Sequence, residues 1–224
     1  MAGELAPGQL AAEIDAAIRA MPAGDTPATR EVRRSYSQRL KHADPAYVLA
    51  VARELLRGFG QRWVAYELVA RHKEAFKGVG ETELEEFGRG MKSWGAVDAF
   101  ARTLAGPAWL RRQVDDDLIE RWGRSDNLWW RRAALVSTVA LNMRSQGGTG
   151  DVPRTLAICG LLAGDREDMV IKALSWALRE LAPHDPDAVR AFLAENDSKL
   201  AARVTREVQH KLKTGLKAPR RRKR

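Results

Sequence analysis

Apolar positions along this chain recur at three- and four-residue intervals, the spacing of a helix with one buried face. In 170–181, for example, Val170, Leu174 and Leu178 follow one another at four-residue steps. No segment alternates apolar and polar residues over the length of a strand, and no Asn-Gly or Asp-Gly pair marks a hairpin turn. The pattern therefore predicts an all-α fold.

Glycine, proline and helix-capping residues divide this pattern into twelve segments. Asp44-Pro45 and Asp185-Pro186 are typical helix starts, with a capping carboxylate before a proline in the first turn. Gly106-Pro107 and Asp197-Ser198 are also interpreted as helix starts. We expect helices at about 7–21, 28–41, 45–57, 60–76, 81–89, 95–105, 107–123, 127–145, 153–163, 166–181, 186–195 and 198–213.

Such helices, joined by short turns, can pair into about six antiparallel hairpins. A pair length of roughly 35–45 residues is typical of HEAT-type repeats. One hairpin cannot bury its apolar face alone, so neighbouring pairs stack into a curved α-solenoid with a concave face. A globular helical bundle is the alternative, because no self-similar sequence marks the repeats. We expect the repeat domain over 1–213 and a disordered basic tail over 214–224.

The charge of the chain is unevenly distributed. The 224 residues carry 38 Lys and Arg against 29 Asp and Glu, a formal net charge of +9. Eight of these bases and no acid lie in the last fourteen residues, which leaves about +1 for 1–210. A basic tail of this kind indicates an arm that contacts nucleic-acid phosphates, with a tail that only aids solubility as the alternative.

Other classes of protein are disfavoured by what the sequence lacks. A single cysteine, Cys159, excludes an internal disulfide framework and a multi-cysteine zinc site. The four histidines are dispersed, so we expect no metal and no cofactor. No apolar stretch approaches the roughly 20 residues of a membrane span, and the acidic N-terminus does not resemble an export signal. We expect a monomer in the cytoplasm or nucleoid of a bacterium.

Three helices carry side chains that suit a core poorly. Arg132 lies among apolar positions of its helix and needs an anion, which could be an internal carboxylate or a phosphate. Trp176 points away from the apolar stripe of its own helix, and by itself it is best explained by packing on a neighbouring repeat. Asp98 follows Trp94 by one turn. It is either a functional carboxylate or one partner of a surface ion pair with Arg102.

The intervals between these residues match the repeat length. Asp98 and Arg132 are 34 residues apart, and Arg132 and Trp176 are 44 apart. In the pairing above, each lies on the second helix of its hairpin, and equivalent helices of a solenoid line one face. We therefore expect Trp94, Asp98, Arg132 and Trp176 to meet on the concave surface.

At these residues the chain resembles the HEAT-repeat alkylpurine DNA glycosylases of the AlkD type, over about 10–212. Gly24-x-x-Pro27-x-x-Arg30 resembles the N-terminal signature of that family. The family pattern often has two adjacent tryptophans before the aspartate, whereas here Gly95 follows Trp94. The longer matching segments are KSWGAVD at 92–98, SDNLWWRRAA at 125–134 and KALSWALRE at 172–180.

The resemblance implies a role for each matched residue. Asp98 falls on the catalytic aspartate, Trp94 and Trp176 on the tryptophans that flank the sugar, and Arg132 on the active-site arginine. The residues that we expect to contact DNA are Arg30, Lys92, Trp130, Arg131 and Lys172.

The implied activity is that of a monofunctional DNA glycosylase acting on double-stranded DNA that contains alkylated purines. A purine alkylated at N3 or N7 is cationic and leaves as a neutral base, so the site needs no general acid. It needs negative charge beside the oxocarbenium-like sugar, which Asp98 could supply while orienting water. Bulky adducts are further candidate substrates. The alternative function is a non-catalytic HEAT-repeat protein that binds DNA structures.

Overall fold

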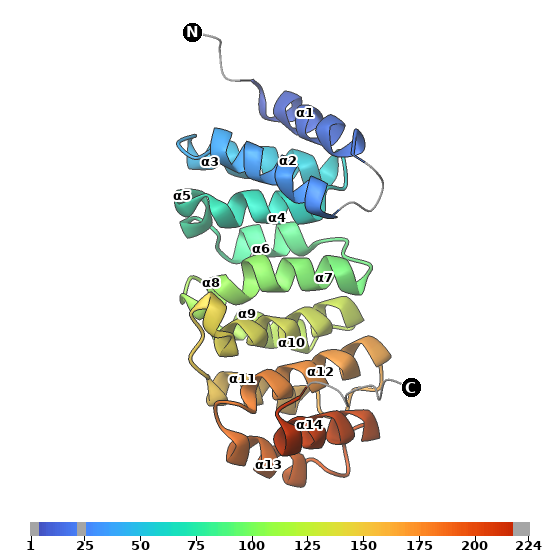
Figure 1. Ribbon diagram of the computed structural model, residues 1–224. Helices are drawn as coiled ribbons and strands as arrows, with labels where there is room; N and C mark the ends of the chain where they lie inside the picture. The colour runs from blue at the N-terminus through green and yellow to red at the C-terminus, as the bar shows by residue number, and fades with distance from the viewer. Residues whose placement is uncertain (1–4, 22–25, 217–224) are drawn as a thin grey trace, which may run out of the picture. The chain divides into compact units, whose positions relative to one another are not determined.

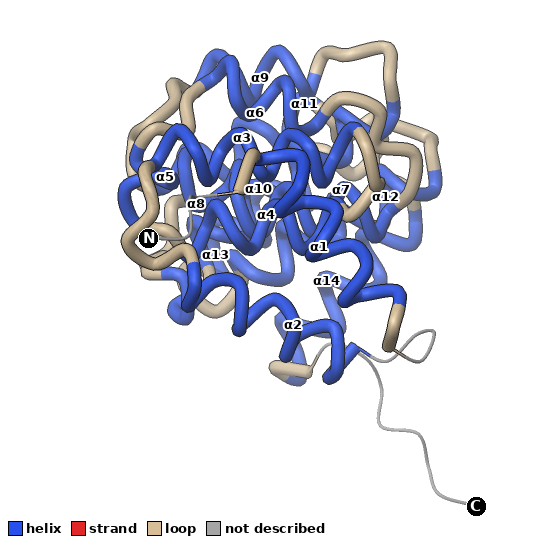
Figure 2. Tube along the Cα trace, turned by 90° about the horizontal axis from the view of Figure 1, so that it is seen from above, coloured by secondary structure: helices blue, strands red, loops and turns tan. Residues whose placement is uncertain are grey.

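The computed structural model describes residues 5–21 and 26–216. All regular elements in these ranges are helices, joined by turns and loops (Figure 2). The predicted all-α class is confirmed. The chain divides into two compact units, Met1–Arg89 and Gly90–Arg224, and each is described by itself.

The N-terminal unit consists of helices stacked on one another (Figure 1). Helix α3 packs against α1 and α4, and its start follows the predicted signal, because the Asp44 carboxylate accepts hydrogen bonds from the N–H groups of Ala46 and Tyr47 at 2.8 and 3.2 Å. Its helices are α1 (Pro7–Arg19), α2 (Thr26–Arg39), α3 (Pro45–Arg57), α4 (Arg62–Arg71), α5 (Lys73–Lys77) and α6 (Glu81–Gly88).

One predicted helix of this unit is two helices. The segment 60–76 is broken at His72, whose backbone is extended between α4 and α5. The His72 ring then caps α5, because its Nδ1 accepts a hydrogen bond from Ala75 N–H at 3.0 Å. Histidine is not among the preferred capping residues, so the sequence pattern continues across the break.

The C-terminal unit holds the remaining helices. Its central helix is α10, which is buried over most of its length and packs against α7 and α12, while α12 in turn packs against α14 (Figure 1). The elements are α7 (Trp94–Phe100), the π-helical turn η1 (Ala101–Ala105), α8 (Gly106–Leu110), α9 (Asp116–Gly123), α10 (Leu128–Asn142), the 3-10 turn η2 (Arg144–Gln146), α11 (Val152–Leu161), α12 (Asp168–Leu181), α13 (Pro186–Glu195) and α14 (Ala202–Thr214).

The predicted boundary at Gly106-Pro107 is wrong. The helix continues from α7 through η1 into α8, and the turn comes later, where Arg112 has a positive φ of 59°. Two physical features explain the difference. A π turn changes the hydrogen-bond register ahead of Pro107, which has no N–H to donate. Gly106 lies against α10, where a Cβ atom would come within 2.7 Å of the Ser137 carbonyl oxygen.

The last helix begins later than predicted. Helix α14 starts at Ala202 and not at Ser198, because 196–200 form a turn in which Leu200 N–H donates to the Asn196 carbonyl oxygen. It ends at Thr214, followed by Gly215 with a positive φ of 69°. Of the predicted tail, 217–224 lie outside the described residues. Within the C-terminal unit, α7, α10, α12 and α14 therefore lie in sequence, as the second helices of stacked pairs should.

Candidate active site

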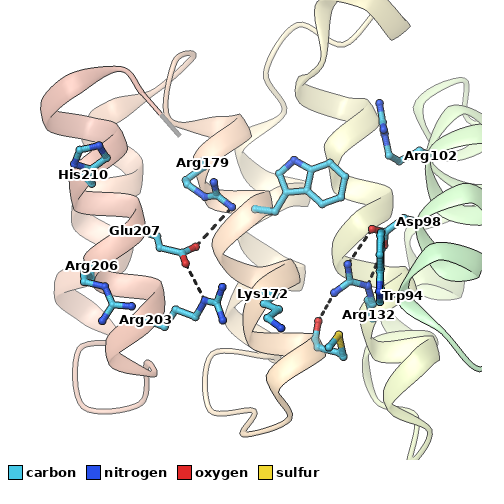
Figure 3. Close-up of a pocket in the computed structure, with 12 residues that line it drawn as sticks. Trp94, Asp98, Arg102, Arg132, Lys172, Arg179, Arg203, Arg206, Glu207 and His210 are labelled. Atoms are coloured by element: carbon cyan, nitrogen blue, oxygen red, sulfur yellow. Dashed lines mark hydrogen bonds and ion pairs between the residues drawn. The ribbon is translucent and has the colours of Figure 1, made fainter. Parts of the chain in front are cut away.

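The second helices of the C-terminal unit form a groove of about 860 Å³ (Figure 3). Arginine and lysine outnumber carboxylates among its side chains, so it is basic although residues 1–210 carry little net charge. It is lined by Trp94, Asp98, Arg102, Arg132, Met169, Lys172, Trp176, Arg179, Arg203, Arg206, Glu207 and His210. The structure thus brings Trp94, Asp98, Arg132 and Trp176 to one groove, as the repeat spacing predicted.

Asp98 is held on α7, one turn from the start of that helix. The Ser93 hydroxyl caps α7 by accepting a hydrogen bond from Ala96 N–H at 3.3 Å. The Asp98 carboxylate accepts two hydrogen bonds from Arg132, from Nε to Oδ1 and from Nη2 to Oδ2, each at 2.9 Å. Its side chain keeps 19% of its surface exposed, so a ligand can still approach it. The partner of Asp98 is therefore Arg132 of α10 and not Arg102.

Arg132 uses each of its guanidinium nitrogens within the protein. Nε and Nη2 donate to Asp98, and Nη1 donates to the carbonyl oxygen of Met169 at the start of α12. Its side chain is only 6% exposed. Of the two anions considered for this arginine, the structure contains the internal carboxylate. Arg132 consequently ties α7, α10 and α12 together and fixes the direction of the Asp98 carboxylate.

The two tryptophans differ in how they are held. Trp94 is 60% exposed, an unusual position for a large aromatic ring. Trp176 is partly buried on α12, and its Nε1–H donates to Glu180 Oε1 at 3.0 Å. The Arg102 guanidinium lies over the Trp176 ring, 5.6 Å from its centroid. The groove therefore presents one free indole and one indole that is already in contact with a cation.

The side of the groove formed by α12 and α14 contains a network of charged side chains. The Ser175 hydroxyl donates to the Glu207 carboxylate at 2.7 Å, and Arg203 Nε donates to it at 2.8 Å. Arg179 lies 3.7 Å from the same carboxylate (Figure 3). Burial alone would raise the pKa of Glu207, but the hydrogen bonds from Ser175 and Arg203 and the nearby arginine charges lower it overall. Glu207 therefore joins α12 to α14 as an ionised group.

Lys172, a predicted DNA contact, lies at the edge of this network. Its Nζ pairs with Asp168 one turn earlier on α12 at 2.6 Å. That hydrogen bond, with the charges of Lys172, Arg203 and Arg132, lowers the pKa of Asp168. Both side chains of this pair are accessible to solvent, so the ion pair is a weak one.

Arg131, a predicted DNA contact, is held by partners within the protein. Its Nε donates to Asp165 at 2.7 Å, and its Nη1 donates to the carbonyl oxygens of Ser125 and Asp126 at 2.9 Å. The side chain is 17% exposed. It joins the loop before α10 to the loop before α12, so its guanidinium already has acceptors within the protein. The reason is angular: consecutive helix residues differ by about 100° and point to different neighbours.

Trp130, another predicted DNA contact, packs in an aromatic cluster within the protein. Its ring centroid is 4.8 Å from that of Trp122 and 6.1 Å from that of Phe100. It is absent from the groove lining and supports the packing of α10 on α7 and α9. Two other predicted DNA contacts are exposed: Lys92, just ahead of α7, and Arg30, on α2 of the N-terminal unit.

Sequence reasoning missed the contribution of α14. Arg203, Arg206 and His210 follow one another at three- and four-residue steps, so they share one face of the helix. That spacing was the available signal. Arg102 and Arg179 also line the groove, and each lies one turn after a residue that the sequence pattern identifies, Asp98 and Trp176 respectively.

Within 5–21 and 26–216, no three His, Cys, Asp or Glu side chains gather in a way that could hold a metal ion. None of the helices in the same ranges has the length and apolar character that crossing a lipid bilayer requires.

A family model described as "DNA alkylation repair enzyme" matches residues 23–212, most of the chain. The comparison with curated proteins finds no match.

Proposed function

The chain belongs to the DNA alkylation repair enzyme family, and within that family we propose that it is a monofunctional DNA glycosylase. The substrate is duplex DNA that contains purines alkylated at N3 or N7, and the reaction is hydrolysis of the N-glycosidic bond. The observation that carries the proposal is the Asp98 carboxylate, which Arg132 fixes in a basic groove that Trp94 and Trp176 also line.

The chemistry requires stabilisation of a cation. As the C1′–N bond breaks, its electron pair goes to the alkylated base, which leaves neutral, and positive charge develops on the deoxyribose. A carboxylate that is already oriented stabilises this charge without reorganisation during the reaction. Water then adds to C1′ and loses a proton to Asp98 and on to solvent.

Arg132 acts here as a positioning residue. Its bidentate contact leaves the Asp98 oxygens other lone pairs with which to bind water. The exposed face of Trp94 and the indole of Trp176 offer electron-rich surfaces to the sugar cation. Because a neutral purine is a poor leaving group, the same groups would leave unmodified DNA intact.

A base-release assay tests the proposal. The substrate is a duplex with one N7-methylguanine, and alkali-labile abasic sites are counted over time. Wild-type protein should release the base well above the spontaneous rate. Asp98→Asn should lower the single-turnover rate by about 100-fold or more. Asp187→Asn, on the exposed surface of α13, is the matched control and should leave the rate unchanged.

A binding experiment tests whether Asp98 stabilises positive charge on the sugar. It uses a duplex with a single pyrrolidine abasic analogue, which places a cationic nitrogen near the C1′ position. The wild type should bind it more tightly than it binds a neutral abasic analogue, and Asp98→Asn should lose this preference. Wild-type protein that binds duplex DNA but releases no base from alkylated substrates would overturn the enzyme proposal. That result would support the alternative of a non-catalytic DNA-binding protein.

A further inference from the structure

Arg102 is a cation in the groove for which the described residues provide no anion. Its Nε is buried and has no hydrogen-bond partner, and its Nη2 contacts only the Met143 sulfur at 4.0 Å. Its other contact is the Trp176 ring. A buried guanidinium N–H without an acceptor is costly, so this arginine is suited to an anion that arrives from outside the chain.

The neighbouring arginine shows the contrast. Arg132 donates from all three of its guanidinium nitrogens to protein acceptors, so a phosphate could bind it only by displacing Asp98 or the Met169 carbonyl oxygen. Arg102 has no such contacts to lose. A cation–π contact and a thioether contact are weaker than charge-assisted hydrogen bonds to an oxyanion.

The position of Arg102 indicates which anion it would meet. It follows Asp98 by four residues and lies on the π-helical turn η1, a distortion that is common at functional sites. Its guanidinium also lies over the ring of Trp176, which is on α12. An anion bound by Arg102 would therefore lie next to the sugar that these two residues flank. In DNA, the anion next to a sugar is its own phosphate.

We propose that Arg102 binds the DNA phosphate adjacent to the nucleotide at Asp98. The inference rests on the proposed function. It assigns to Arg102 the phosphate contact that the sequence had suggested for Arg132. When the phosphate binds, the guanidinium moves from the Trp176 ring to the oxyanion and makes the indole face available to the sugar.

The first experiment measures binding to unmodified duplex as a function of salt concentration. Arg102→Met removes the charge but keeps an unbranched side chain. The slope of log K against log salt concentration should become shallower by about 0.9, the value for one phosphate contact. Affinity at fixed moderate salt should fall roughly tenfold. Arg102→Lys should restore most of the slope, and Arg190→Met, on α13 outside the groove, should not change it.

The second experiment identifies the phosphate. In duplexes with the pyrrolidine analogue, the phosphate on either side of the analogue is replaced in turn by a neutral methylphosphonate. At one of these positions the methylphosphonate should lower the affinity of the wild type. The same replacement should not lower the affinity of Arg102→Met any further, because this variant already lacks the phosphate contact. An unchanged salt slope, or equal losses for wild type and Arg102→Met at both positions, would overturn the proposal.

These readouts are separate from catalysis. If the wild type releases no base but the salt slope and the methylphosphonate pattern depend on Arg102, the proposed glycosylase activity fails while the phosphate contact stands. If base is released and neither measurement depends on Arg102, the phosphate contact fails while the proposed glycosylase activity stands.

Discussion

Arg132 and Arg102 line the same groove in opposite circumstances. One has acceptors for every guanidinium nitrogen, and the other has an indole, a thioether and a buried N–H without a partner. Both are arginines in apolar surroundings, so hydrophobic periodicity cannot distinguish them. Their roles follow from the side chains that adjoining helices bring to them, which is information that only the fold supplies.

Substitution of Arg132 should affect stability and activity together. Arg132→Met leaves the Asp98 carboxylate and the Met169 carbonyl oxygen without their donor, and removing one partner of a buried pair costs about 3 kcal/mol. Urea denaturation should show this loss, and the base-release rate should fall because the carboxylate is no longer oriented.

Arg132→Lys provides the second measurement. One ammonium group cannot reproduce the bidentate contact, so partial recovery of stability without full recovery of rate is expected. Arg190→Met is the surface control, with a change within about 0.5 kcal/mol. Wild-type rates in Arg132→Met would remove this residue from the site.

At the scale of elements, the sequence predicted the starts of α3 and α13 from their caps. Asp44 and Asp185 both accept hydrogen bonds from the first turns of the helices that follow them. The errors come from tertiary contacts. The pattern at Gly106-Pro107 resembles a helix start, but packing against α10 and the π turn carry the helix through it. His72 breaks a helix with an atypical cap.

A pair of glycine substitutions tests the packing of α8 on α10. In Gly106→Ala the new Cβ would lie 2.7 Å from the Ser137 carbonyl oxygen and 2.8 Å from the Ala140 Cβ. Both are backbone or helix atoms that cannot turn away, so the free energy of unfolding should fall by about 1–3 kcal/mol. Gly95→Ala, in α7 with nothing within 4 Å, should raise it by about 0.5 kcal/mol. Equal effects in urea denaturation would contradict the tight contact.

The contact of α12 with α14 predicts a dependence of stability on pH. Because the pKa of folded Glu207 lies below its ordinary value of 4.5, folding favours the ionised group. Its contribution is fully present above 4.5 and is lost as pH falls through the lower folded pKa. Glu207→Gln should therefore destabilise the protein at neutral pH, and the difference from wild type should shrink in acid. The exposed control Glu195→Gln should show no such trend in urea denaturation.

At the scale of the whole molecule, the net charge of +9 reflects the C-terminal end of the chain and not the composition of the groove. The residues before 211 carry about +1, yet the groove is rich in bases. The repeat spacing predicted that Trp94, Asp98, Arg132 and Trp176 would share a surface, because equivalent helices align in a stack. It could not predict Arg203 and Arg206, whose place depends on where α14 begins. It also could not settle the partner of Arg132, since a phosphate and a carboxylate satisfy the same guanidinium.

The bases of the C-terminal tail should contribute to DNA binding and not to base release. A variant that ends at Leu216 lacks Lys217, Arg220, Arg221, Arg222, Lys223 and Arg224. If all six bases contact phosphates, the salt slope for duplex binding should become shallower by about 5. The full-length chain with these six residues replaced by glutamine should behave alike, because charge and not length is responsible. At saturating DNA, base release should be unchanged in both variants, whereas Asp98→Asn should show the reverse, with normal salt dependence and little release. An unaltered salt slope in the shortened chain would mean that these bases make no phosphate contacts, and binding would then depend on the grooved surface alone.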